Sequence, residues 1–139
     1  MTVGTQLFIE KHIDWIENNE FDKIYSKESL ETFDRSELTE ILLSIGIDPL
    51  KHLTFVPENY LSESSIKQFI VPSHIDRIST AAFWECRELE KVTLPEGLIF
   101  IEDSAFSECH KLAQINLPST LEYVYDIYYD FVLFHSFFL

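Results

Sequence analysis

The second half of the chain repeats with a period of 23 residues, and this feature constrains the fold more than any other. The copies at 75–95 and 98–118 align without a gap, and further matches extend the register to roughly 66–126. The matching positions are Ile78/Ile101, Ala82/Ala105, Phe83/Phe106, Cys86/Cys109, Leu89/Leu112, Val92/Ile115, Leu94/Leu117 and Pro95/Pro118. A constant period of this length predicts a solenoid, because each unit buries its apolar side only by stacking on its neighbours.

The repeated pattern, I-x-x-x-A-F-x-x-C-x-x-L-x-x-V-x-L-P, resembles the BspA-like class of leucine-rich repeats, which is common in bacterial and phage proteins. The resemblance implies a short curved solenoid with two short strands per repeat, an apolar interior and a role in protein recognition. It implies neither shared catalytic residues nor a cofactor. The chain departs from the family pattern at Ser79, Glu102 and Tyr125, where the family favours glycine.

The periodicity of the sequence changes before the repeats, which divides the chain into three expected parts. We expect an α+β protein with a three-helix amino-terminal cap at 1–56 and a leucine-rich-repeat β-solenoid at 57–126. An aromatic tail at 127–139 is expected to cap the far end of the solenoid or to form a dimer.

Three short amphipathic helices are expected in the amino-terminal part. The first begins with Thr5 as its N-cap, and the second spans roughly 20–27. The third begins with a capping box formed by Asp34 and Glu37 and ends at Gly46. Because the first rung of a repeat array exposes unpaired strand edges and apolar surface, we interpret these helices as a cap. The alternative interpretation is that they form a binding module of their own.

The chain is strongly acidic, with 24 Asp and Glu against 10 Lys and Arg and a formal net charge of −14. A field of this sign repels nucleic acid and anionic membranes and attracts basic protein surfaces. The second interpretation is that the acidity only keeps a solenoid with much apolar surface soluble. Composition alone leaves both interpretations open.

Cys86 and Cys109 lie one repeat apart and therefore occupy equivalent positions in neighbouring rungs. The family resemblance places this cysteine toward the core, so we interpret both as buried thiols that act as small apolar residues. The alternatives are a disulfide or half of a metal site, although a zinc site needs about four ligands. The first residues contain no basic region and no long apolar stretch, so we expect a reducing, cytoplasmic location.

The second strand of each repeat predicts an unusual outer face. Alternation along these strands turns Arg77, Ile99, Phe100 and Tyr123 outward. Exposed aromatic rings beside an arginine are the composition typical of interface hot spots. These four residues therefore form the predicted partner-binding face. The alternative is that the aromatic tail or the helical head covers it.

The tail is rich in aromatic residues, but only nine residues follow Asp130, whereas a membrane span needs about 20 apolar residues. It also lacks the Lys and Arg of a membrane-surface anchor. The tail is instead expected to close the last rung or to pack on the same tail of a second copy. The residues assigned to this cap or dimer contact are Tyr128, Tyr129, Phe131, Phe134, Phe137 and Phe138.

The sequence contains no recognisable catalytic or metal-binding motif. Three glycines are too few for a phosphate-binding loop, and the five histidines have no metal-ligand spacing. A basic patch for nucleic acid is also missing. We therefore predict no catalytic residues, no metal and no cofactor, and a protein that is not an enzyme.

These observations favour a protein-binding module that occludes a basic partner, which an acidic surface would attract and exposed aromatic rings would hold. By analogy of charge and size, the partner could be a host-defence nuclease that a phage-encoded, anti-CRISPR-like inhibitor blocks. The alternative function is a structural or assembly protein that self-associates through its tail.

Overall fold

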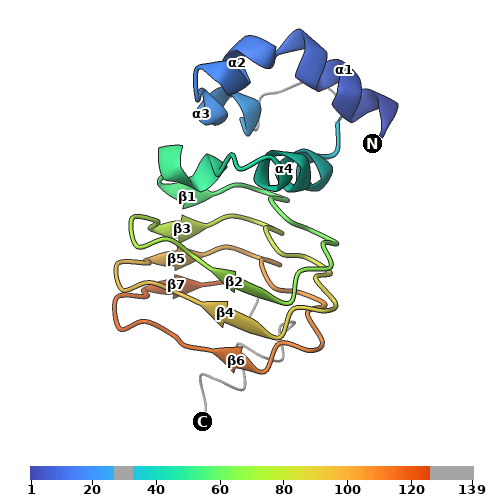
Figure 1. Cartoon of the computed structure of the whole chain (residues 1–139). Helices are drawn as coiled ribbons and strands as arrows, with labels where there is room; N and C mark the ends of the chain where they lie inside the picture. The colour runs from blue at the N-terminus through green and yellow to red at the C-terminus, as the bar shows by residue number, and fades with distance from the viewer. Residues whose placement is uncertain (27–32, 126–139) are drawn as a thin grey trace.

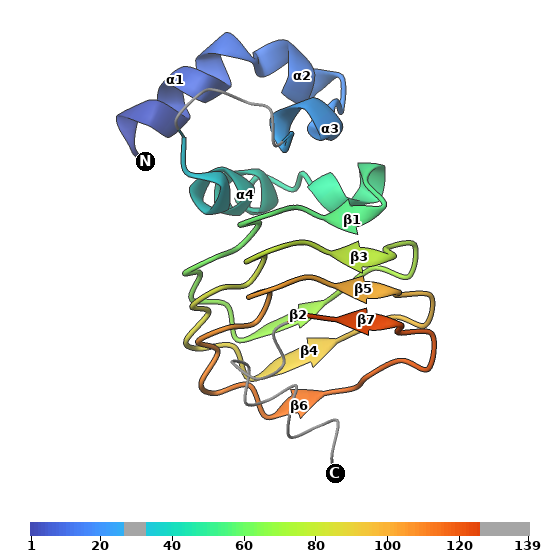
Figure 2. The ribbon, with the colours of Figure 1, turned by 180° about the vertical axis from the view of Figure 1, so that it is seen from behind.

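The computed structural model describes residues 1–26 and 33–125. A group of helices lies across one end of a solenoid made of two parallel sheets, and the chain then runs rung by rung away from the helices (Figure 1). Seen from behind, α4 (Arg35–Ser44) lies between the other helices and the first rung (Figure 2). The observed architecture is therefore an α+β solenoid.

The head contains four helices among the described residues, not the three expected. They are α1 (Val3–Lys11), α2 (Ile13–Glu17), α3 (Phe21–Ile24) and α4, followed by the 3-10 turn η1 (Pro49–His52). The first expected helix is interrupted at His12, whose φ of −120° and ψ of 32° break the helical geometry. Neither glycine nor proline marks this interruption, so the sequence pattern gave no sign of it.

The expected N-cap of the first helix was wrong. Thr2 caps α1, because its hydroxyl accepts a hydrogen bond from the Thr5 backbone N–H at 3.3 Å. Thr5 is instead buried, and its hydroxyl donates to Glu37 at 3.0 Å. Glu37 therefore holds α1 against α4.

The predicted ends of α4 are confirmed in part. Asp34 caps the helix by accepting a hydrogen bond from the Glu37 backbone N–H at 3.0 Å. Gly46 adopts a φ of +85°, and its N–H and that of Ile47 bond back to carbonyls of the last turn, as expected for a glycine that ends a helix. The carboxylate of Glu37 turns to α1 to bond Thr2 and Thr5, so the structure shows only half of the predicted capping box.

Two parallel sheets form the solenoid. One contains β1 (Phe55–Val56), β3 (Arg77–Ile78), β5 (Phe100–Ile101) and β7 (Tyr123–Val124), and the other contains β2 (Gln68–Ile70), β4 (Lys91–Thr93) and β6 (Gln114–Ile115). Arg77 pairs with Phe100 and Phe100 with Tyr123, which confirms the period of 23 residues as the distance from rung to rung.

The first rung begins earlier than the sequence pattern indicated. Strand β1 lies within 1–56, the range expected to be helical, and Phe55 pairs with Arg77, which is 22 residues later. In this rung Tyr60, Leu61 and Ser64 stand in place of the repeated Ala, Phe and Cys. The shorter period and these substitutions together concealed the rung.

The turns between strands use left-handed backbone at repeated positions. Ala81 and Ser104 have φ values of 56° and 59°, and Glu85 and Glu108 have values of 54° and 62°. The family position that favours glycine is occupied by Ser79, which is not among the residues with positive φ. The missing glycine therefore imposes no backbone strain there, because the left-handed residue follows two positions later.

Apolar side chains fill the space between the sheets and continue into the head. The rings of Tyr25, Tyr60, Phe69, Phe83 and Phe106 contact one another in sequence, with centroid distances of 5.7, 6.4, 5.1 and 5.3 Å. Both cysteines are buried and form no disulfide, as expected. Each thiol donates to a carbonyl of the preceding rung, at 3.0 Å for Cys86 and 3.1 Å for Cys109. Head and solenoid share one core.

Candidate protein-binding face

A row of stacked side chains crosses the outer face of the four-stranded sheet. The Arg77 guanidinium carbon lies 4.5 Å from the centroid of the Phe100 ring. The Phe100 and Tyr123 rings are 4.9 Å apart and nearly parallel at 7°, and Tyr125 lies 6.5 Å beyond at 9°. We call these four residues the aromatic ladder. The spacing follows from the fold, because neighbouring strands lie about 4.8 Å apart and equivalent residues fall in register.

The structure brings together three of the four predicted partner-binding residues: Arg77, Phe100 and Tyr123. Tyr123 is 47% exposed, and the Arg77 side chain is 44% exposed. Ile99 lies one residue before β5, is half-buried and stands outside the ladder. The sequence reasoning missed Tyr125, although a residue two positions after Tyr123 falls on the same face of an extended segment.

An ion pair fixes the orientation of Arg77. Its guanidinium donates to Glu102 Oε1 at 3.1 Å, and the other carboxylate oxygen of Glu102 accepts from the Thr80 hydroxyl at 3.1 Å. The guanidinium is therefore held between a ring and a carboxylate. This combination of cation–π and charged hydrogen-bond contacts suits arginine better than lysine.

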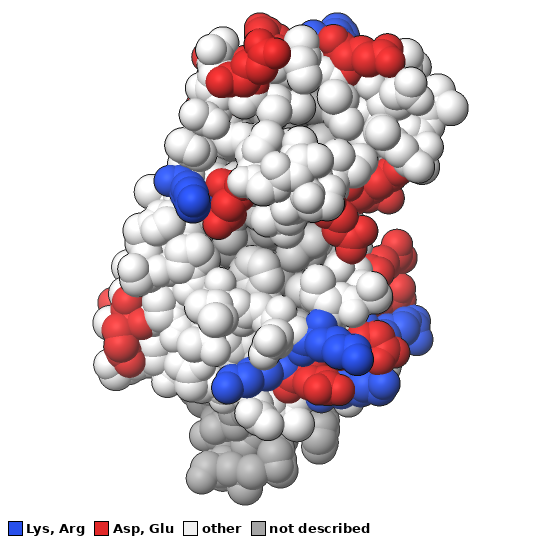
Figure 3. Space-filling view, in the orientation of Figure 1, with Lys and Arg blue, Asp and Glu red and all other residues white. Residues whose placement is uncertain are grey.

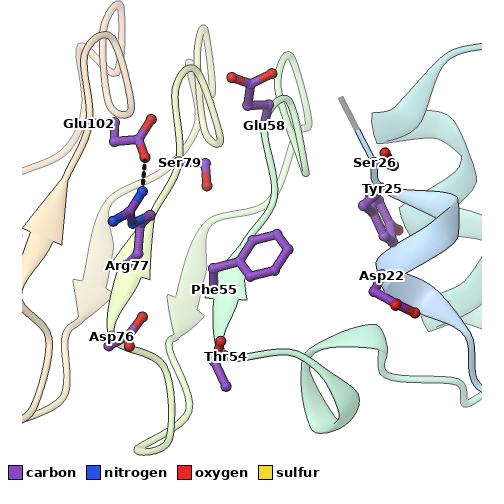
Figure 4. A pocket seen from close by; sticks show the side chains of 10 residues that line it. All are labelled: Asp22, Tyr25, Ser26, Thr54, Phe55, Glu58, Asp76, Arg77, Ser79 and Glu102. Carbon is purple, nitrogen blue, oxygen red and sulfur yellow. Dashed lines mark hydrogen bonds and ion pairs between the residues drawn. The ribbon is translucent and has the colours of Figure 1, made fainter. Parts of the chain in front are cut away.

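Two hollows flank the Arg77–Glu102 pair. The larger, of about 410 Å³, lies between the first rungs and the head, and its lining includes Tyr25, Phe55, Glu58 and Asp76. Figure 4 shows the Phe55 ring projecting between the Arg77–Glu102 pair and the Asp22 and Tyr25 side chains of the head. The smaller, of about 330 Å³, is lined by Arg77, Phe100, Glu102, Asp103 and Tyr125.

Phe55 was also not predicted from the sequence, because its strand was not recognised. It lies in register with Arg77 and so continues the column of the ladder by one rung toward the head. Across the hollow, Tyr25 presents a neutral ring. Burial raises the pKa of its phenol, and its hydroxyl is already hydrogen-bonded to Thr39 at 2.7 Å.

The two hollows have a pronounced negative charge. Among the described residues that line them, the carboxylates are Asp22, Glu58, Asp76, Glu102 and Asp103, whereas Arg77 is the sole cation. Lys and Arg side chains gather elsewhere, low on the face that carries β2 and β4, where they alternate with acidic residues (Figure 3). One such contact joins Lys111 to Glu88 at 2.7 Å.

The helical head borders the ladder face without burying Arg77 or Tyr123, which stay partly exposed. The other predicted cover, the aromatic tail, lies outside the described residues, as do all six of its assigned contact residues. Within residues 1–26 and 33–125 no group of His, Cys, Asp and Glu is arranged to hold a metal ion. None of the helices described there is long and apolar enough to cross a membrane.

Comparison with known proteins places the repeats in a family. A crystal structure of a leucine-rich cell surface protein from Faecalibacterium prausnitzii A2-165 is 32% identical over 52% of this chain, with a TM-score of 0.42. The match spans only 18% of that longer protein. A search of curated proteins finds no match. The model of the BspA type leucine-rich repeat region matches residues 54–132 in six copies, beginning one residue before β1. The chain therefore belongs to the BspA-type leucine-rich repeat family.

Proposed function

We propose that this chain is a non-enzymatic protein-binding module and that the aromatic ladder with its two hollows is the binding face. The family indicates a protein-interaction or repeat module. The observation that carries the choice of face is the stack of Arg77, Phe100 and Tyr123, which is exposed to solvent in part. Arginine and tyrosine are enriched at interface hot spots, where they supply large contact areas.

The ladder is ordered before a partner arrives. Its rings stack on each other, and the Arg77–Glu102 ion pair holds the guanidinium in place. Side chains that are fixed in advance lose less conformational entropy on binding, so more of the contact energy contributes to affinity. The net charge of −14 would accelerate encounter with a basic partner at low salt. Occlusion of the partner's own binding surface is the proposed mechanism.

The narrower proposal, that the partner is a nucleic-acid enzyme and the chain a phage-encoded inhibitor of a host-defence nuclease, rests on charge and size alone. A cytoplasmic location is part of the same proposal. The structural alternative, self-association through the tail, depends on residues outside the described ranges. Light scattering of the purified chain at low and high salt distinguishes the inhibitor from the self-associating protein, because an assembly protein would remain oligomeric at both salt concentrations.

Affinity capture with ladder variants tests the proposed face. The wild-type chain, a Phe100→Ala/Tyr123→Ala variant and a Leu7→Ala/Ile70→Ala control serve as baits in nuclease-treated bacterial lysate. The control residues are 59% and 74% exposed and lie on α1 and β2, away from the ladder. We expect the ladder variant alone to lose specific proteins, with affinity reduced about tenfold or more. Equal capture by all three folded baits would eliminate the ladder as the binding face.

A further inference from the structure

We propose that the ladder face receives an extended, arginine-bearing segment of a partner protein, with a guanidinium group placed in each of the two hollows. This inference rests on the proposed function and specifies the chemistry of the partner at the same face. Three features of this face support it: the internal contact of Arg77, the composition of the larger hollow and the charge balance of both hollows.

Arg77 shows how this face holds a guanidinium. Its cationic group lies 4.5 Å from the Phe100 ring centroid and 3.1 Å from the Glu102 carboxylate. The contact therefore joins the face of an aromatic ring to an acidic hydrogen-bond acceptor, and both components favour a planar cation. A partner arginine needs the same two components at another position on the face.

The larger hollow supplies those components one rung closer to the head. Phe55 provides the ring, in register with Arg77 on the neighbouring strand, and Asp76 and Asp22 provide carboxylates. Tyr25 forms part of the opposite wall. The volume of about 410 Å³ lies within the range typical of ligand pockets, roughly 300–1,000 Å³. The hollow can therefore accept a long side chain that enters from solvent.

Charge determines which side chain is favourable there. Asp22, Glu58, Asp76 and Glu102 line the larger hollow. Arg77 is paired with Glu102, and Arg35, which donates to the carbonyl of the lining residue Ser26 at 2.6 Å, is the cation that acts on Glu58. Asp22 and Asp76 are the remaining carboxylates of this lining. An anionic or phosphate group would meet like charges, and an apolar group would cover carboxylates without compensating them. A cation instead lowers the repulsion among the carboxylates. Charge complementarity thus favours a basic protein segment over an acidic segment or a nucleic acid.

The smaller hollow lies on the other side of the Arg77–Glu102 pair and shares both residues with the larger one. It repeats the combination of a ring and a carboxylate with Tyr125 and Asp103, because Arg77 and Tyr123 already cover the two faces of the Phe100 ring. An extended segment that crosses the ion pair can therefore present one cation to each hollow. This arrangement explains why a segment with several arginines should bind more tightly than one with a single arginine.

Fluorescence anisotropy with the full chain tests the chemistry directly. The probe is a fluorescein-labelled peptide of three serine–arginine pairs, and the control peptide carries citrulline, which keeps the planar shape but has no charge. We expect the citrulline peptide to bind at least about tenfold more weakly, since a charged hydrogen bond contributes more than a neutral one. Binding of the arginine peptide should also weaken as salt increases.

Variants then separate the hollow from the overall charge. Asp22→Asn/Asp76→Asn should weaken binding of the arginine peptide about fivefold or more, whereas Asp14→Asn/Glu17→Gln removes the same charge on α2 and should have less than half that effect. Phe55→Leu keeps every charge and should weaken binding by removing the ring. Equal losses in the two double variants, or equal affinity for the citrulline peptide, would overturn the inference.

The two proposals fail in different ways. If the arginine peptide does not bind but ladder substitutions still abolish capture of a protein partner, the face is correct and the partner chemistry is wrong. If ladder substitutions leave capture unchanged, the binding face itself is wrong, whatever the peptide does. Circular dichroism of each variant verifies that lost binding is not lost folding.

Discussion

At the scale of single residues, Glu37 joins the first turn of α1 to α4. Its carboxylate accepts hydrogen bonds from the Thr2 backbone at 2.6 Å and from the Thr2 and Thr5 hydroxyls at 2.9 and 3.0 Å. Desolvation opposes ionisation, but these hydrogen bonds outweigh it and lower the pKa of Glu37 below its ordinary value of 4.5. The carboxylate therefore stabilises the folded chain most when it is ionised.

The lowered pKa gives a stability prediction with a defined sign. Because the folded pKa lies below the unfolded pKa, the contribution is complete above pH 4.5 and disappears as pH falls through the folded value. We expect Glu37→Gln to lower the urea midpoint at pH 7, and the difference from the wild type to shrink in acid. Urea titrations from pH 7 to pH 3 measure this difference. A difference that stays constant over this range contradicts the assignment.

Single residues also show where sequence reasoning succeeds. Arg77, Phe100 and Tyr123 could be placed on one outer face because the repeat fixes their register and strand alternation fixes their direction. The partner of Glu37 could not be predicted, because Thr2 and Thr5 are more than 30 residues away and their approach depends on how the helices pack. Local sequence patterns predict a capping residue, but tertiary contacts determine which donors its side chain binds.

At the scale of elements, the turns of the solenoid repeat a left-handed residue that is not glycine. Ser104 has a φ of 59°, a conformation that costs L-residues roughly 1–2 kcal/mol. We expect Ser104→Gly to raise the free energy of unfolding by about 0.5–1 kcal/mol, since glycine relieves this strain but loses more entropy on folding. Chemical denaturation measures the change.

Ser73→Gly provides the matched control for this prediction. Ser73 is an exposed turn residue that is not among those with positive φ, so glycine relieves no strain there. The free energy of unfolding of this control should fall by a few tenths of a kcal/mol to about 1 kcal/mol through entropy alone. Stabilisation by both substitutions, or by neither, would show that the turn conformation is not the cause.

The elements also show why the period predicted some strands and missed others. Strands β3, β5 and β7 follow the 23-residue spacing, whereas β1 precedes β3 by 22 residues and its rung lacks the repeated Ala, Phe and Cys. Tyr60 and Leu61 are nevertheless fully buried, and the Tyr60 ring contacts Phe69 in the interior. Stacking requires an apolar side chain of suitable volume and not a particular residue type. A rung can therefore differ in sequence from the repeat and still pack.

At the scale of the molecule, the shared core makes the head and the solenoid one cooperative unit. Buried residues continue without interruption from Phe8 in α1 to Leu112 before β6. The Tyr25–Tyr60 ring contact crosses the junction at 5.7 Å. In a repeat protein each rung is stabilised by its neighbours, so loss of the head exposes the interior of the first rung. The sequence pattern changes near residue 56, but we expect the parts before and after this boundary to fold and unfold together.

The two tryptophans allow a direct test, since Trp15 lies in α2 of the head and Trp84 in a turn of the solenoid. Trp15→Phe and Trp84→Phe each leave one fluorescent reporter. Because a cooperative unit unfolds in a single transition, we expect each variant's fluorescence midpoint in urea to coincide with its own midpoint by circular dichroism. An earlier fluorescence transition for the Trp15 reporter alone would mean that the head melts first. The larger hollow would then lose its Tyr25 wall before the ladder unfolds, and arginine-peptide binding would fail at a lower urea concentration than the solenoid itself.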